Sequence, residues 1–208
     1  MLVVGLGNPG KRYARTPHNV GFRVLDGFVD QAPGTAGVVG EKAQLTWSGR
    51  FDGEVVVTAR GTRELVLLKP LTYMNRSGES VRKAMSFFKV SEESTLVVHD
   101  EIDLPLATLK LKRGGGEAGH NGLLSISAEI GTRDYSRLRV GVGRPTTGPV
   151  ADFLLTPLPS ADEAVLEGCL GAARDAIDLW ALEGIERAMN SVNQRPPGAT
   201  PLKAGPTN

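Results

Sequence analysis

His18 and Asp100 are the two residues of this chain that best fit general base chemistry. His18 follows a glycine-rich turn that carries Asn8, and Asp100 directly follows the apolar run Thr95–His99. Histidine is the side chain whose ordinary pKa lies near neutral pH, and a carboxylate bonded to one ring nitrogen makes the other nitrogen a better base. The pair therefore predicts a histidine that activates a water molecule.

Asparagines near this pair could position a carbonyl group. Asn8 and Asn75 each follow a predicted strand, and Asn121 follows His120 between a glycine loop and a helix. An amide N–H directed at a developing oxyanion can contribute about 3 kcal/mol to catalysis. No serine or cysteine in these segments stands on a nucleophile elbow, so the base would activate water directly. Direct attack by water suits an ester better than an amide.

Each of these residues also has an ordinary structural interpretation. A loop histidine is more often exposed or structural than catalytic, and Asn8 and Asn75 could be turn or cap residues. A metal site that joins a histidine to Asp100, Glu101 or Asp103 is conceivable. However, no standard ligand spacing such as H-E-x-x-H is present. We expect neither a metal nor a cofactor.

The first turn matches a nucleotide-binding pattern literally. Gly5, Gly7 and Gly10 spell the G-x-G-x-x-G that opens a dinucleotide-binding helix. That motif needs a helix running on from its third glycine, to hold a pyrophosphate at the helix N-terminus. Here KRYARTP follows, without an apolar stripe, and Pro17 would break such a helix. We expect the turn to present Asn8 instead.

Alternating strand and helix patterns predict the frame that positions these residues. The predicted strands cover 2–4, 43–47, 54–59, 64–68, 95–99, 107–112 and 137–142, and the predicted helices cover 19–31, 76–89, 121–130 and 161–189. Ser160 and Glu163 form a capping-box pattern at the start of the last helix. The pattern predicts an α/β fold, a single globular domain over residues 1–190 with a twisted mixed β-sheet flanked by helices.

The arrangement of the strands decides whether the polar residues meet. If the strands before Asn8, Asn75 and Asp100 are parallel, their carboxyl ends share one edge of the sheet. That edge is the expected site.

The end of the chain and its single cysteine limit the class of protein. From Ser191 onward the chain is polar and rich in proline, so we expect residues 191–208 to form a disordered tail. Cys169 excludes an internal disulfide and lies within an apolar helical stripe, where buried filler is its expected role. We find no signal peptide and no apolar run of membrane-spanning length, and we expect a cytoplasmic protein.

The distribution of charge is more informative than its total. The chain has 24 basic and 23 acidic residues. Residues 105–145 hold seven basic and three acidic residues, whereas residues 146–190 hold eight acidic residues and two arginines. A basic region favours a polyanionic partner, although solvated surface is the commoner explanation of scattered charge.

Four motifs carry a resemblance to a known family. They read GLGNPGKRYARTPHNVGF, LLKPLTYMNRSG, HDEIDLPLATLKLKRGGGEAGHNGL and RLRVGVGRP. In this order they closely resemble bacterial-type peptidyl-tRNA hydrolase, over residue 2 to about residue 190. The resemblance implies hydrolysis of the ester that joins a peptide to the terminal ribose of tRNA. It also implies a mixed-sheet α/β domain that is usually monomeric and works without a metal.

The resemblance assigns roles to the polar residues. It implies that His18 is the general base, that Asp100 orients it, and that Asn8 contributes to catalysis and to the choice of blocked over free aminoacyl groups. The substrate-binding positions that it implies are Tyr13, Tyr73, Asn75 and Asn121. The positions that it implies for the tRNA backbone are Lys110, Lys112 and Arg139, which agrees with the basic region, since lysine and arginine make most phosphate contacts.

Two departures from the family pattern and two rival functions remain. Pro17 stands where many members have a basic residue, and Glu117-Ala118 stands in a loop that often carries His-Gly. We expect Pro17 to stiffen the approach to His18 and Glu117 to weaken local attraction for tRNA. The rival functions are a non-catalytic RNA- or ribosome-binding homologue, which needs no base–carboxylate pair, and a metal-dependent hydrolase.

Overall fold

The computed structural model describes residues 1–31, 45–196 and 198. Its strands are β1 (Leu2–Gly5), β2 (Ser48–Arg50), β3 (Gly53–Arg60), β4 (Arg63–Pro70), β5 (Thr95–Glu101), β6 (Leu109–Arg113) and β7 (Ser136–Gly141). Its α-helices are α1 (Val20–Gln31), α2 (Ser77–Phe88), α3 (Asn121–Ile130), α4 (Val150–Leu154), α5 (Ser160–Glu183) and α6 (Ile185–Val192). Four short 3-10 helices are η1 (Lys11–Tyr13), η2 (Pro17–Asn19), η3 (Met74–Arg76) and η4 (Glu92–Ser94).

One mixed sheet joins the described strands in the order β2-β3-β4-β1-β5-β7-β6. β1 lies at the centre and pairs in parallel with β4 and β5, and β5 pairs in parallel with β7. The two ends of the sheet are antiparallel, at β2-β3-β4 and at β6-β7. The predicted α/β class is confirmed. The three strands that precede Asn8, Asn75 and Asp100 are parallel, which is the condition under which their ends share one edge.

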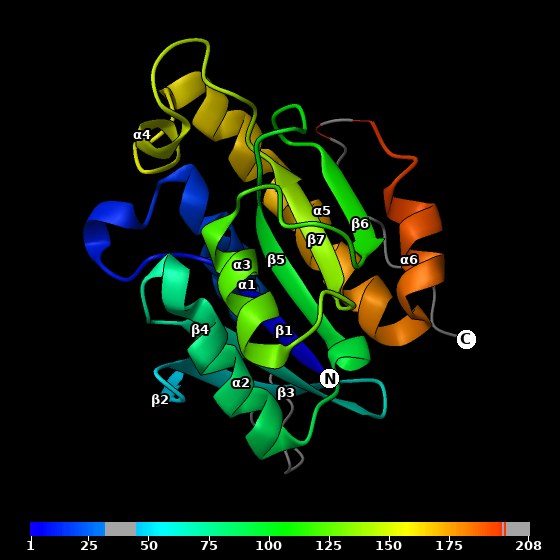
Figure 1. Ribbon diagram of the computed structural model, residues 1–208. Coiled ribbons are helices and arrows are strands. Elements are labelled where there is room, and N and C mark those ends of the chain that lie inside the picture. The colour runs from blue at the N-terminus through cyan, green and yellow to red at the C-terminus, as the bar shows by residue number, and fades with distance from the viewer. Residues whose placement is uncertain (32–44, 197, 199–208) are drawn as a thin grey trace.

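Helices cover both faces of the sheet (Figure 1). Side chains from α1, α5 and α6 pack on one face, and those from α2 and α3 pack on the other. β1 contributes to both cores, because successive side chains of a strand point to opposite faces: Val3 joins the first core, and Leu2 and Val4 join the second. A central strand buried on both faces explains the continuously apolar start of the chain.

The strand predicted at 43–47 is wrong. Residues 43 and 44 lie outside the described residues, residues 45–47 form no strand, and β2 begins at Ser48. Leu45 and Trp47 are partly buried against the first core, on the face of the sheet that α1, α5 and α6 cover. The Lys69 ammonium lies 4.1 Å from the centre of the Trp47 ring. These apolar residues therefore reflect packing of an irregular segment.

The last helix also differs from the prediction. It is two helices, because Gly184 has φ 86° and ends α5 before α6 begins. The predicted capping box is absent from the start of α5, where Pro159 is the N-cap residue and no side chain caps the helix. The Glu163 carboxylate instead accepts hydrogen bonds from Arg15 and Arg23. The Glu163 side chain, which the local pattern assigned to the cap, therefore forms ion pairs with arginines distant in sequence.

The domain boundary expected at residue 190 falls inside α6. Val192 is buried, and the Asn193 side chain pairs with the backbone of Leu111 in β6 through bonds of 2.7 and 2.9 Å. This side chain satisfies backbone groups at the open edge of the sheet. Residues 191–196 therefore belong to the fold, while residue 197 and residues 199–208 lie outside the described residues.

Cys169, in α5, is buried in the first core, as expected. Burial raises the pKa of its thiol to about 11, so the thiol is not a nucleophile at neutral pH. None of the helices in the described ranges is long and apolar enough to cross a membrane.

Gly21 sets how closely α1 approaches the sheet. A Cβ at this position would lie 2.3 Å from the Leu6 nitrogen and 2.5 Å from the Val98 oxygen, both backbone atoms. We expect Gly21→Ala to lower the free energy of unfolding by about 1–3 kcal/mol, measured by urea denaturation. Gly168→Ala is the matched control, because a Cβ there meets nothing within 4 Å and α5 should gain up to about 1 kcal/mol. Equal effects of the two changes would contradict this packing.

Candidate active site

The ends of β1, β4 and β5 open into one pocket of about 620 Å³. Its walls also include the start of α3 and one face of α4. The lining residues are Asn8, Tyr13, His18, Tyr73, Met74, Asn75, Asp100, Glu101, Ile102, Glu117, Ala118, Gly119, His120, Asn121, Val150, Ala151, Leu154 and Leu155. All seven predicted catalytic and substrate-binding residues are in this set, so the structure brings them together.

His18 is held against Asp100 by local structure on both sides. Thr16 Oγ1 donates to the Tyr13 carbonyl at 2.8 Å, and Pro17 occupies the first position of η2, where no backbone N–H is required. The buried His18 ring then places Nδ1 at 2.8 Å from Asp100 Oδ1. Asp100 is itself buried at the end of β5.

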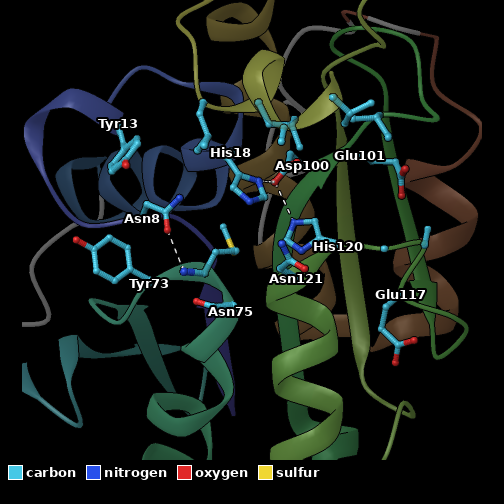
Figure 2. A pocket seen from close by; sticks show the side chains of 18 residues that line it. Asn8, Tyr13, His18, Tyr73, Asn75, Asp100, Glu101, Glu117, His120 and Asn121 are labelled. Carbon is cyan, nitrogen blue, oxygen red and sulfur yellow. Dashed lines mark hydrogen bonds and ion pairs between the residues drawn. The ribbon is translucent and has the colours of Figure 1, made fainter. Parts of the chain in front are cut away.

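A second histidine bonds to the same carboxylate oxygen. His120 Nε2 lies 3.0 Å from Asp100 Oδ1 (Figure 2). His120 Nδ1 accepts from the backbone nitrogens of Gly122 and Leu123 at 3.1 and 3.4 Å, which makes His120 the N-cap of α3. Since Nδ1 accepts, the proton of neutral His120 must be on Nε2, where it is donated to Asp100.

The same reasoning fixes the chemistry of His18. Asp100 is an acceptor, so His18 donates from Nδ1 and keeps an unshared pair on Nε2. Burial by itself lowers the pKa of His18, but the charge of Asp100 and its hydrogen bond outweigh burial and raise that pKa above the usual 6.5. Burial by itself raises the pKa of Asp100, but His120 and His18 outweigh it and hold that pKa well below its usual range. The arrangement produces a strengthened imidazole base beside a permanent carboxylate.

His99 contacts both His120 and the backbone of Asp100. Its ring packs edge-on against His120, with centroids 5.0 Å apart, and its Nδ1 donates to the Asp100 carbonyl at 2.7 Å. Burial is the largest cause that lowers the pKa of His99 to about 3, so this ring stays neutral. His99 is not among the residues that line the pocket. It therefore contacts the His120 ring and the Asp100 backbone from outside the pocket lining.

Asn8 is fixed through all of its backbone groups and its side-chain oxygen. The Asn19 side chain bonds to the backbone nitrogen and oxygen of Asn8, both at 2.9 Å. Asn8 Oδ1 accepts from the Met74 backbone nitrogen at 2.9 Å, which leaves the amide nitrogen on the opposite side of the group, towards His18 (Figure 2). After Gly10 the chain forms the short η1 and η2 before α1 begins at Val20, so no α-helix runs on from the third glycine of the pattern, and Asn8 lines the pocket.

The predicted tRNA-backbone residues lie beside the pocket, on β6 and β7. Arg139 Nε donates to Glu101 Oε2 at 3.0 Å, and Glu101 lines the pocket. Lys110 is opposite Arg139 in the ladder, and its ammonium donates to the Asn193 carbonyl. Lys112 is half-buried, and its pKa is lowered, by burial first and then by the charges of Arg137 and Arg139. Several lysine and arginine side chains are thus concentrated on this part of the sheet.

Known proteins identify the family to which this arrangement belongs. The family model described as peptidyl-tRNA hydrolase matches residues 2–199. The chain belongs to the peptidyl-tRNA hydrolase family. A peptidyl-tRNA hydrolase of Sorangium cellulosum is 46% identical over 199 residues, which cover 94% of this chain and 85% of that protein. The peptidyl-tRNA hydrolase of Desulfitobacterium hafniense is 41% identical, with 93% and 99% covered.

A solved structure shows the same fold. The crystal structure of peptidyl-tRNA hydrolase from Acinetobacter baumannii superposes with a TM-score of 0.84 at 34% identity, over 95% of this chain and 96% of that one. The family resemblance read from the motifs and the predicted fold are both confirmed. The protein is a hydrolase, and its reaction is the hydrolysis of peptidyl-tRNA.

The departure at Glu117 from the peptidyl-tRNA hydrolase pattern has a structural explanation. The buried Glu117 carboxylate accepts from Arg133 Nε at 2.7 Å, so its negative charge has a partner within the protein. Arg137 donates to the carbonyls of Gly115 and Gly116, each at 2.7 Å. Two arginines therefore hold the loop that forms one wall of the pocket, and the charge of Glu117 is paired within the protein.

His120 and the apolar wall of the pocket were missed as site residues. His120 precedes the predicted Asn121, but its bond to Asp100 depends on where α3 docks, and no local pattern records that. α4 spans five residues, too few to show a helical repeat, yet Val150, Ala151 and Leu154 line the pocket. Glu101 could have been included from its position beside Asp100.

One group in the described part of the chain has the residue types for a metal. The possible ligand atoms of His18, Asp100 and His120 lie within 4.8 Å of one another. However, both rings donate to Asp100 Oδ1, and His120 Nδ1 caps α3. A cation among them would have to replace both hydrogen bonds to Asp100. The geometry therefore fits a proton-transfer site better than a metal centre.

The raised pKa of His18 gives a pH test of the pair. His18 is a base only when neutral, so kcat/KM should fall as the pH drops through a midpoint above 6.5. Asp100→Asn removes the charge that raises this pKa and leaves the burial that lowers it. We expect the acidic limb to move to lower pH and the plateau to fall roughly 10²-fold or more. Asp103→Asn, which changes an exposed partner of Arg144, is the control. An unmoved limb in Asp100→Asn would separate Asp100 from the base.

Proposed function

We propose that His18 is the general base with which this protein hydrolyses the ester bond of peptidyl-tRNA and releases free tRNA and peptide. One observation carries the proposal: Asp100 Oδ1 takes hydrogen bonds from two imidazoles, which leaves His18 Nε2 as an unprotonated nitrogen in the pocket. This reaction recycles tRNA from aborted translation.

The proposed reaction proceeds by attack of water on the ester carbonyl. His18 Nε2 takes one proton from the water while the water oxygen bonds to the carbonyl carbon, and Asp100 stabilises the imidazolium that forms. The Asn8 amide nitrogen donates to the developing oxyanion. Collapse of the tetrahedral intermediate breaks the bond to the ribose oxygen, and that oxygen takes the proton from His18. The base is thereby restored.

The remaining lining residues suit the two parts of the substrate at the ester. The exposed Tyr73 ring and the half-buried Tyr13 ring offer aromatic surface, and Asn75 and Asn121 offer amides. The apolar wall includes Met74, Ile102 and residues of α4. A pocket of about 620 Å³ is within the usual size range for small-ligand sites. We assign Tyr13, Tyr73, Asn75 and Asn121 to binding of the substrate end.

The β6–β7 surface is the proposed site for the tRNA backbone. Two paired strands carry three cations on the same face: Lys110, Lys112 and Arg139. Arg139 donates a hydrogen bond to Glu101, which lines the pocket. Burial and then the charges of Arg137 and Arg139 lower the pKa of Lys112, and a bound phosphate would offset the repulsion among these cations. We further propose that the protein works as a monomer in the cytoplasm, where translation supplies its substrate.

A non-catalytic RNA-binding homologue is the weaker alternative. Binding alone would not require a buried carboxylate shared by two imidazoles, because burying a charge is costly unless it is paired and hydrogen-bonded. Such a protein would still need the β6–β7 cations.

His18→Ala tests the base directly. We expect turnover of N-acetyl-aminoacyl-tRNA to fall at least ~10²-fold while tRNA binding is retained, because the change removes proton transfer and leaves the basic surface intact. The measurement is release of the N-acetyl amino acid beside a filter-binding assay. Unchanged turnover would remove His18 from the mechanism.

The same assay separates the rival functions. Wild-type protein should cleave the blocked ester and spare the unblocked aminoacyl-tRNA, with the same rate in the presence of EDTA. Loss of activity in EDTA that returns with added metal would establish the metal-dependent hydrolase. Binding of tRNA without cleavage would establish the RNA-binding alternative.

Lys112→Gln tests the basic surface. We expect a higher KM for the tRNA substrate and a salt dependence flatter by roughly one unit of slope, with turnover at saturation nearly unchanged. Arg113→Gln is the control on the neighbouring position, because Arg113 is already paired with Asp134 and Glu93. If the two variants show the same salt slope as the wild type, the tRNA backbone lies elsewhere.

A further inference from the structure

The basic residues near the start of the chain fall into two groups. Arg15 and Arg23 both pair with Glu163 at the start of α5, at 3.0 and 2.9 Å. Lys11 and Arg12 in η1 are exposed, and neither forms an ion pair with a carboxylate in the described part of the chain. The charges of the second group are therefore available to an external anion.

Arg12 lies against a residue of the pocket wall. Its guanidinium carbon is 4.5 Å from the centre of the Tyr13 ring, and Tyr13 lines the pocket. The turn that carries both residues is fixed, because Tyr13 N donates to Gly10 O and Thr16 N donates to Tyr13 O, each at 3.0 Å. Gly10 has φ 108°, a conformation that favours glycine. The fixed turn therefore keeps the Arg12 guanidinium against the ring of Tyr13.

The pocket residues that Arg12 and Arg139 contact lie on opposite sides of His18. Tyr13 is on one side of His18 in Figure 2, and Glu101, the partner of Arg139, is on the other. A nucleic acid whose terminal ester reaches His18 must pass over the edge of the pocket. A planar guanidinium that is stacked on an aromatic ring and lacks a carboxylate is well suited to bind a phosphate through two parallel hydrogen bonds.

We propose that Arg12, with Lys11 beside it, is a second phosphate-binding position of this enzyme, on the opposite side of the pocket from Lys112 and Arg139. It binds the phosphodiester backbone of the single-stranded 3′ end of the tRNA, immediately before the nucleotide that carries the ester. The proposal rests on the proposed function and adds a binding position to it. Cations on two sides of the pocket would align the end of the strand with His18.

The test compares two substrates that differ in phosphate. Arg12→Gln should raise KM severalfold for N-acetyl-aminoacyl-tRNA and lower its salt slope by roughly 0.7, the value for one phosphate contact to a single strand. It should leave the hydrolysis of N-acetyl-aminoacyl adenosine, which has no phosphate, unchanged. Arg12→Lys should recover most of the salt slope, because it keeps the charge.

Arg76→Gln is the matched control. Arg76 is also an exposed arginine beside a pocket residue, Asn75, but two hydrogen bonds of 2.7 and 2.9 Å pair it with Glu79. We expect this variant to keep both KM and salt slope.

Two results would overturn the proposal. The first is an Arg12→Gln variant that behaves like Arg76→Gln on the tRNA substrate. The second is an equal loss on both substrates, which would mean that Arg12 acts by holding Tyr13 in place. Failure of the proposed function is distinguishable from both, because the wild-type protein would then cleave neither ester.

Discussion

A single buried oxygen, Asp100 Oδ1, is the atom on which the site depends. It accepts from His18, which is part of η2, and from His120, which is the N-cap of α3. A carboxylate in a buried position is stable only when its charge is compensated, so both rings must present an N–H to it. This requirement fixes the tautomers of both histidines. The reactive nitrogen of His18 is thus determined by a hydrogen bond on the other side of its ring.

The order and direction of the strands bring His18 and Asp100 close enough to form this hydrogen bond. β1 and β5 are parallel neighbours, so the loop after β1 and the end of β5 reach the same edge. Gly21 lets α1 approach the backbone of β1 and β5 closely, and α1 follows η2 directly. On the other side, His120 is both the cap of α3 and a partner of Asp100, so the docking of α3 and the orientation of the carboxylate are one arrangement.

Much of this could be predicted from the chain alone, because strand ends and apolar periodicity are local signals. His18, Asp100 and Asn8 follow such strands, and the helix predicted at 121–130 has those bounds in the structure. The misses depend on partners distant in sequence. Glu163 has the spacing of a cap but pairs with Arg15 and Arg23, and Leu45 and Trp47 look like a strand but pack as an irregular segment. His120 is adjacent to a predicted residue, yet only tertiary structure brings it to Asp100. The roles of the site residues remain predictions.

The central position of β1 has a consequence for the order of events during synthesis. β1 is made before the other described strands, but its partners β4 and β5 come much later in the chain, with Val4 opposite Leu68 and Val97. Such non-local pairing cannot form until those residues have been made. His18 and Asp100 therefore meet only after the chain has been made as far as β5. A nascent chain that stalls before β5 can pair β1 with β4 but has no base–carboxylate pair, so the site cannot form until β5 has been made.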